Sequence, residues 1–168
     1  MDDLMYGRGS IGGPFTLTDQ TGHKRSDSEF RGKLMIVYFG YTSCPDVCPT
    51  DLMAITQVLD ELGPLAKDIQ PIFITIDPER DASVLAEYLG AFHKSFIGLA
   101  GSDEEIRKLA YAYKAFYAKL PNASGGGYLI DHTGVIYLMG RKGEYLGFMP
   151  PQTEPVRLAE IVRKQLAK

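Results

Sequence analysis

Apolar positions along this chain follow two patterns, continuous runs and a helical period. Residues 34–39 and 71–76 are almost wholly apolar, which predicts strands that are buried on both faces of a sheet. Shorter strands are predicted at four further places: 15–17, 97–99, 128–130 and 135–139. Between 48 and 62 the apolar residues recur at helical spacing and stop at Gly63-Pro64, which predicts a helix. Three more helices are predicted: 82–93, 103–115, and from a cap at Thr153 to about 167.

The order of these elements predicts a single α/β domain. Strands alternate with helices, and the strands at 128–130 and 135–139 flank Asp131-His-Thr-Gly134, a turn signal that favours a closing hairpin. We therefore predict a thioredoxin-like three-layer sandwich, in which helices flank a central mixed β-sheet and an N-terminal strand or hairpin extends it. Residues 14–168 would form this domain, and the glycine-rich residues 1–13 would form a flexible leader or stalk.

Composition limits the classes of partner. Of the 168 residues, 45% are hydrophobic and 23% are charged, with a net charge of −3, which is typical of an ordinary globular domain. We expect no nucleic-acid partner, because the chain has no basic block. No apolar run approaches the roughly 18 residues needed to span a bilayer. Met1-Asp2-Asp3 also lacks the basic start of a signal peptide, so we expect the chain as given to be soluble.

The chain has two cysteines, Cys44 and Cys48, which directly follow the predicted strand 34–39. Pro49 disfavours helical geometry at Cys48 and suits a first helical turn, so both thiols are expected at or just before a helix N-terminus. Unpaired N–H groups there favour the thiolate form. Such a pair can exchange disulfides or bind a soft metal. A purely structural disulfide is a weaker interpretation of this pair, because closing so short a loop stabilises a fold by only about 2 kcal/mol.

The number of available ligands favours copper among the soft metals. Thiolates select Cu(I), Zn(II) or iron–sulfur clusters. Structural zinc and iron–sulfur sites usually take four protein ligands, whereas this chain offers two cysteines and three histidines. His23 is expected to be solvated in a turn, and His93 to end a helix. His132 follows a predicted strand at a sheet end, and from the residues alone it could be either a ligand or a solvated turn residue.

Asp77 directly follows the predicted strand 71–76. In a parallel sheet it would share the carboxyl edge with the segment that follows the first central strand, where ligand sites are favoured. Its carboxylate could orient His132 or tune the thiolates, or it could only cap the turn before Pro78. The charges that come next are interpreted as those of a helix start: Glu79, Arg80 and Asp81.

Four segments together resemble the Sco/SenC family: Gly12–Leu17, Val37–Thr50 with both cysteines, Thr75-Ile-Asp-Pro-Glu-Arg-Asp81, and Tyr128-Leu-Ile-Asp-His-Thr133. The resemblance covers residues 11–167. It implies a thioredoxin-fold protein that binds copper and assists assembly of the binuclear copper centre of cytochrome c oxidase. It also implies that Cys44, Cys48 and His132 are the copper ligands, with Asp77 beside the metal.

The resemblance further implies partners and a location. One copper ion, as Cu(I) or Cu(II), would be delivered to the copper-bearing subunit of the oxidase, and another copper chaperone or a thiol reductant would be a second partner. Family members usually carry an N-terminal membrane anchor, with the domain in the bacterial periplasm or the mitochondrial intermembrane space. We expect a monomer that acts as a metallochaperone rather than as an enzyme.

Three alternatives stay open. A thiol–disulfide oxidoreductase would use Cys44 and Cys48 as its redox pair, but such proteins usually carry a proline shortly before the strand that precedes the final hairpin. Counted back from the predicted strand 128–130, that position falls near Gly125, where the sequence has none. A peroxidase would have threonine three residues before the reactive cysteine, where this chain has Tyr41. The third alternative is a protein-interaction module that binds no metal.

Overall fold

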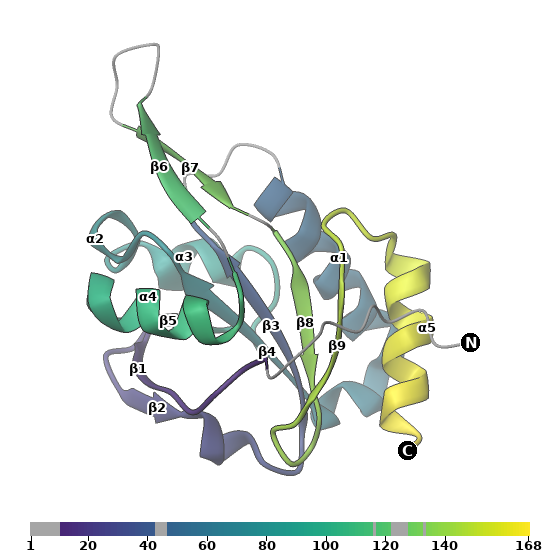
Figure 1. Cartoon of the computed structure of the whole chain (residues 1–168). Coiled ribbons are helices and arrows are strands. Elements are labelled where there is room, and N and C mark those ends of the chain that lie inside the picture. The colour runs from purple at the N-terminus through teal and green to yellow at the C-terminus, as the bar shows by residue number, and fades with distance from the viewer. Residues whose placement is uncertain (1–10, 43–46, 116, 122–127, 133) are drawn as a thin grey trace.

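The computed structural model describes residues 11–168 except 43–46, 116, 122–127 and 133. Its middle layer is a seven-stranded mixed sheet in the order β2-β1-β5-β4-β3-β8-β9 (Figure 1). These strands are β1 (Thr16–Asp19), β2 (Lys24–Ser26), β3 (Leu34–Gly40), β4 (Ile69–Thr75), β5 (Ile97–Ala100), β8 (Ile136–Met139) and β9 (Tyr145–Met149). A separate two-stranded sheet pairs β6 (Tyr117–Pro121) with β7 (Tyr128–His132).

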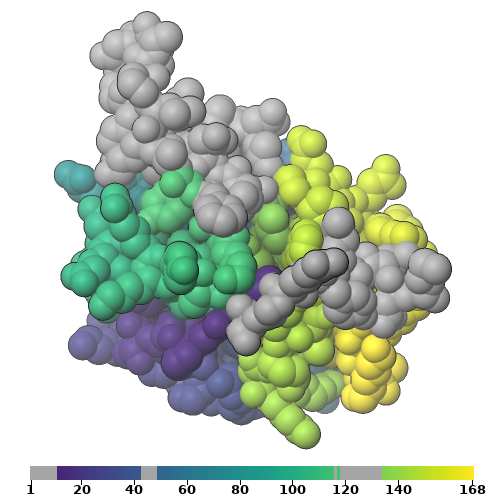
Figure 2. All heavy atoms as spheres, in the orientation of Figure 1, coloured from purple at the N-terminus to yellow at the C-terminus, as the bar shows by residue number. Residues whose placement is uncertain are grey.

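Helices cover both faces of the main sheet. The helices are α1 (Val47–Leu62), α2 (Pro78–Asp81), α3 (Leu85–Gly90), α4 (Asp103–Ala112) and α5 (Pro155–Leu166), with short 3-10 turns η1 (Asp27–Phe30) and η2 (Gly63–Asp68). Within the described ranges, no helix combines the length and apolarity that crossing a bilayer requires. Figure 2 shows the face that carries α4, with the β1–β2 hairpin below it and the β8–β9 hairpin beside both.

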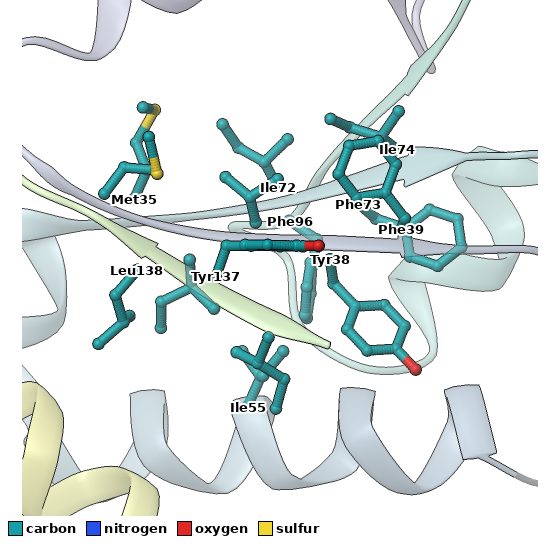
Figure 3. Close-up of a cluster of buried hydrophobic side chains, with 14 of the residues drawn as sticks. Met35, Tyr38, Phe39, Ile55, Ile72, Phe73, Ile74, Phe96, Tyr137 and Leu138 are labelled. Carbon is teal, nitrogen blue, oxygen red and sulfur yellow. The ribbon is translucent and has the colours of Figure 1, made fainter. Parts of the chain in front are cut away.

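The aromatic contacts show which helix covers which face. Tyr38 of β3 lies near Phe73 of β4, and Phe73 in turn lies near Tyr88 of α3. On the opposite face, Phe39 packs edge-to-face against Tyr113, directly after α4. Successive side chains of a strand point to opposite faces, so the sheet separates α3 from α4. Figure 3 shows the buried cluster, with Ile55 between α1 and the sheet.

This arrangement is the predicted thioredoxin-like three-layer sandwich. The two central strands are β3 and β4, which pair in parallel and are buried along their whole length. The predicted N-terminal hairpin is also present, since β1 pairs antiparallel with β2. The predicted leader stays a prediction, because residues 1–10 lie outside the described part of the chain.

The predicted closing hairpin is wrong in its pairing. β7 was expected to pair with β8 across residues 131–134, but β7 pairs with β6 and β8 pairs with β9. The reason is a tight turn beyond β8, in which the Gly143 N–H donates to the Gly140 carbonyl at 2.9 Å. Gly143 has φ of +82°, a backbone conformation that suits glycine. This turn lets the chain reverse directly into β9.

Two helix boundaries also differ from the prediction. The helix expected over 82–93 is two short helices, α2 and α3, so His93 lies beyond the end of α3 rather than at a helix end. There its Nδ1 lies within hydrogen-bonding distance of the backbone N–H and hydroxyl of Ser95. The last helix begins after Glu154 instead of Thr153, because the Thr153 hydroxyl donates to the Pro150 carbonyl at 2.6 Å.

Candidate metal centre

Four chain segments meet at one edge of the main sheet. The carboxyl ends of β3 and β4, Gly40 and Thr75, are register partners. β8 runs antiparallel to β3, and its first residue, Ile136, pairs with Tyr38. β9 ends at the same level, because Met149 pairs with Ile136. The residues that follow β3, β4 and β9 and those that precede β8 therefore share this edge (Figure 1).

The predicted ligands belong to two of these segments. Cys48 is the second residue of α1, so its backbone lies at the helix N-terminus as predicted. His132 ends β7, where it pairs with Tyr117, and it precedes β8 by a few residues. Cys44 and the side chains of Cys48 and His132 lie outside the described part of the structure. The structure thus brings the two backbone segments to one edge, and the ligand set stays a prediction.

Asp81 connects the cysteine segment, residues 41–48 after β3, to β4. Its side chain is fully buried and accepts three hydrogen bonds. Thr42 donates two of them, from its N–H to Oδ2 at 2.9 Å and from its hydroxyl to Oδ1 at 2.7 Å. Thr75 donates the third from its hydroxyl at 2.6 Å. Asp81 lies in α2, as the interpretation of a helix-start charge predicts, and these donors hold it inside the fold.

Asp77 is buried beside Asp81 and precedes α2. Its N–H donates to the Thr75 hydroxyl oxygen at 3.0 Å, and its carboxylate forms an ion pair with Arg80. No cap hydrogen bond from this carboxylate to α2 is present, so the turn-cap alternative is not supported. The Arg80 guanidinium also lies 6.0 Å from the ring centre of Tyr41, three residues before Cys44. Asp77 therefore lies at the predicted edge, with a cation between it and the cysteine segment.

Asp51 anchors the other end of the cysteine segment. It is fully buried in α1 and accepts a hydrogen bond from the Tyr38 hydroxyl at 2.8 Å and one from the Gln152 N–H at 2.7 Å. These bonds tie α1 to β3 and to the loop after β9. Sequence reasoning missed Asp51, although it lies one turn before Ile55 on the apolar face of a predicted helix. A carboxylate at such a position needs buried hydrogen-bond donors, and that signal was available.

A groove opens next to the first turn of α1. It has a volume of about 470 Å³ and lies between α1 and the loop that leads into α5. Its lining includes Pro49, Thr50, Met53, Gln152 and Glu154. Met53 is 45% exposed, so the surface beside Cys48 is accessible and partly apolar.

Tyr117 pairs with His132 across the β6–β7 ladder and carries a neutral phenol. Burial of the half-buried Tyr117 raises the pKa of its hydroxyl, and the negative charge of Asp103 raises it further, whereas Arg107 opposes both effects. The phenol stays protonated at neutral pH, so it adds no charge next to the predicted ligand. Among residues with described side chains, no three of the types His, Cys, Asp and Glu gather closely enough to hold a metal ion.

Comparison with known proteins gives consistent matches over nearly the whole chain. The SCO1/SenC family model matches residues 5–167. An SCO2-like protein of Rickettsia conorii is 40% identical over 157 residues, which cover 92% of this chain and 77% of that protein. The structure of Bradyrhizobium japonicum ScoI with copper bound is 40% identical, with a TM-score of 0.84, and the match covers 93% of this chain and 99% of that one.

The mitochondrial SCO1 homolog of Homo sapiens is 41% identical over 145 residues. These residues cover 84% of this chain and 48% of the human protein. The chain therefore spans about half the length of this relative.

Proposed function

Because this chain belongs to the SCO1/SenC family, we propose that it binds one copper ion through Cys44, Cys48 and His132 and delivers it to cytochrome c oxidase during assembly. The observation that carries the proposal is the convergence of the segment after β3 with the segment before β8 at one sheet edge. A relative that is 40% identical over nearly its whole length has a structure with copper bound, which supports copper as the cargo.

The chemistry of the donor set fits copper. Cys48 lies in the first turn of α1, where unpaired N–H groups and the positive end of the helix dipole favour a thiolate. Two thiolates suffice for Cu(I), and an imidazole adds a ligand that Cu(II) prefers. Asp77 would act from the adjacent segment by orienting the imidazole or by tuning the charge at the site.

We propose an extracytoplasmic, membrane-anchored setting, in which the acceptor is the copper-bearing subunit of the oxidase. The SCO1 homolog of Homo sapiens is mitochondrial, which is compatible with such a setting. Another copper chaperone or a thiol reductant would load or reduce the site. The exposed groove beside the first turn of α1 is compatible with transfer, because an acceptor's thiolates must reach the metal and exchange its ligands one at a time.

Substitution of the three proposed ligands tests the assignment. Cys44→Ser or Cys48→Ser should each abolish stable copper binding, because one thiolate and one imidazole make a weak site. His132→Ala should mainly weaken Cu(II), since Cu(I) can remain on two thiolates. Equal retention of Cu(II) by His132→Ala and by the unaltered protein would remove His132 from the ligand set.

The pairing of β8 with β9 changes where the alternative function, a thiol–disulfide oxidoreductase, would require its proline. The final hairpin pairs β8 with β9, so its first strand is β8 and not β7. The proline expected shortly before that first strand would therefore lie just before β8 rather than near Gly125. Residues 133–135 are Thr-Gly-Val, so this position also lacks proline. We expect the copper-loaded protein to transfer copper to the soluble copper domain of an oxidase subunit and to reduce insulin slowly. Fast insulin reduction without copper transfer would favour the oxidoreductase.

A further inference from the structure

We propose that Asp81 is a positioning residue, which fixes the start of the cysteine segment through its two hydrogen bonds with Thr42. The proposal rests on the function proposed above and adds to it a residue that touches neither the metal nor a proposed ligand. Thr42 is the second residue after β3 and the second before Cys44. Its orientation therefore sets the direction in which the chain leaves the sheet toward the first thiol.

The contact between Asp81 and Thr42 fixes orientation as well as distance. Thr42 donates its N–H to Oδ2 and its hydroxyl to Oδ1, so both carboxylate oxygens hold the same residue. Two bonds from one residue to a planar group allow less rotation than a single bond does. A single backbone hydrogen bond would leave Thr42 free to turn about it, whereas this pair does not.

The carboxylate is itself held in place by the sheet. The Thr75 hydroxyl at the end of β4 donates to Oδ2 at 2.6 Å, and the Asp81 N–H donates to the Asp77 carbonyl at 3.0 Å. The Thr75 hydroxyl oxygen also accepts the Asp77 N–H. The Thr75 hydroxyl at the end of β4 therefore holds the backbone of Asp77 directly and the start of the cysteine segment through Asp81.

The donors around Asp81 match a carboxylate. All three side-chain contacts of Asp81 are with donors, two hydroxyls and one N–H. A carboxylate accepts at both oxygens, whereas asparagine would direct an NH₂ group toward at least one donor. The carboxylate is fully buried, and the three donors compensate for the loss of its contacts with water.

The other end of the cysteine segment is anchored independently. Asp51 holds α1 against β3 through Tyr38 and against the loop after β9 through Gln152. Buried apolar side chains of α1 hold this end together with these hydrogen bonds. Loosening of Thr42 should therefore change the separation and orientation of the two thiols while leaving α1 in place.

The test compares two Thr→Val substitutions, because Asp81 variants are liable to unfold. Thr42→Val removes the 2.7 Å hydroxyl contact to Asp81, and Thr21→Val removes a 2.6 Å hydroxyl contact to Asp19 in the β1–β2 turn. In the sheet order β1 is three strands away from β3, so Thr21 is a matched control. Thr42→Ser keeps the hydroxyl and serves as the rescue variant.

Two measurements are made on each protein. One is copper affinity. The other is the equilibrium of the reduced protein with glutathione disulfide. In this reaction the two thiols lose two protons and two electrons and form the Cys44–Cys48 disulfide. Glutathione disulfide takes up these protons and electrons and becomes two glutathione molecules. Thr42→Val should weaken copper binding about tenfold and shift the glutathione equilibrium several-fold. Thr42→Ser should restore both values, and Thr21→Val should change neither by more than about twofold.

Equal effects of Thr42→Val and Thr21→Val on both measurements would overturn the positioning role, as would failure of Thr42→Ser to restore them. The glutathione equilibrium needs only the two thiols and no metal. If the unaltered protein bound no copper, the proposed function would fail, while this second measurement would still decide the role of Asp81.

Discussion

Replacing Tyr38 with phenylalanine tests how strongly the buried carboxylate of Asp51 supports the fold. The substitution removes one hydroxyl and leaves the ring, which is fully buried between β3 and α1. The lost contact is a 2.8 Å hydrogen bond to a fully buried carboxylate. Hydrogen bonds to charged groups contribute roughly 1.5–3 kcal/mol, so we expect the free energy of unfolding to fall by about 2 kcal/mol. For a chain of this length the Tm should fall by about 4–8 °C.

Urea denaturation of the reduced, metal-free protein measures this loss, with the m-value as a check that the unfolded state is unchanged. Tyr111→Phe is the matched control, because Tyr111 is 80% exposed and the same hydroxyl is removed in solvent. The control should change the free energy of unfolding by less than about 0.5 kcal/mol. Equal values for the two variants would show that the Tyr38–Asp51 bond does not hold α1 against β3.

Three further substitutions test other contacts. Burial alone would raise the pKa of Asp19, but hydrogen bonds from Thr21, His23 and Arg25 lower it from the ordinary value of 3.8 to about 2. This lowered pKa contributes about 2 kcal/mol to the free energy of unfolding, which should be present in full above about pH 5 and lost as the pH falls toward 2. Asp19→Asn should remove this pH dependence in urea titrations. Gly98→Ala should lower the free energy of unfolding by about 1–3 kcal/mol in the same titration, because its Cβ would lie 2.5 Å from Leu89 Cδ1. In the control Gly90→Ala the new Cβ meets no atom within 4 Å, so the free energy of unfolding should not fall. Asp77→Asn should weaken copper binding about tenfold in a competition titration, while Glu79→Gln, on the exposed side of the same turn, should leave it unchanged.

The central strands could be predicted from the sequence because β3 and β4 are buried on both faces, so Thr75 is the one polar residue in the runs 34–39 and 71–76 apart from the tyrosine hydroxyl of Tyr38. The partners of β7 and β8 could not be predicted in this way. Their pairing depends on the turn between Gly140 and Gly143 and on the short strands β6 and β9, neither of which shows a regular alternation of apolar and polar residues. Local turn signals near His132 therefore indicated a hairpin that tertiary pairing replaces.

The candidate site divides in the same way. Cysteine carries distinctive chemistry, so residue type and position predicted Cys44 and Cys48 as candidates, whereas the resemblance to the Sco/SenC family implied His132 as a ligand. Asp51 and Asp81 look like ordinary helix charges, and their roles depend on donors far away in the chain. Gln152 is 101 residues from Asp51, and Thr42 is 39 residues from Asp81. Only the folded chain brings these groups together, so the sequence alone does not predict the residues that support the site.

Copper titration of the protein in its dithiol and disulfide forms tests the central claim most directly. Metal content and the thiolate-to-copper absorption are measured together with a count of free thiols. The account predicts one copper per chain for the reduced protein and loss of that capacity when Cys44 and Cys48 form a disulfide, because the metal needs both thiolates. Equal copper binding by the disulfide form, or no binding by the reduced form, would contradict it.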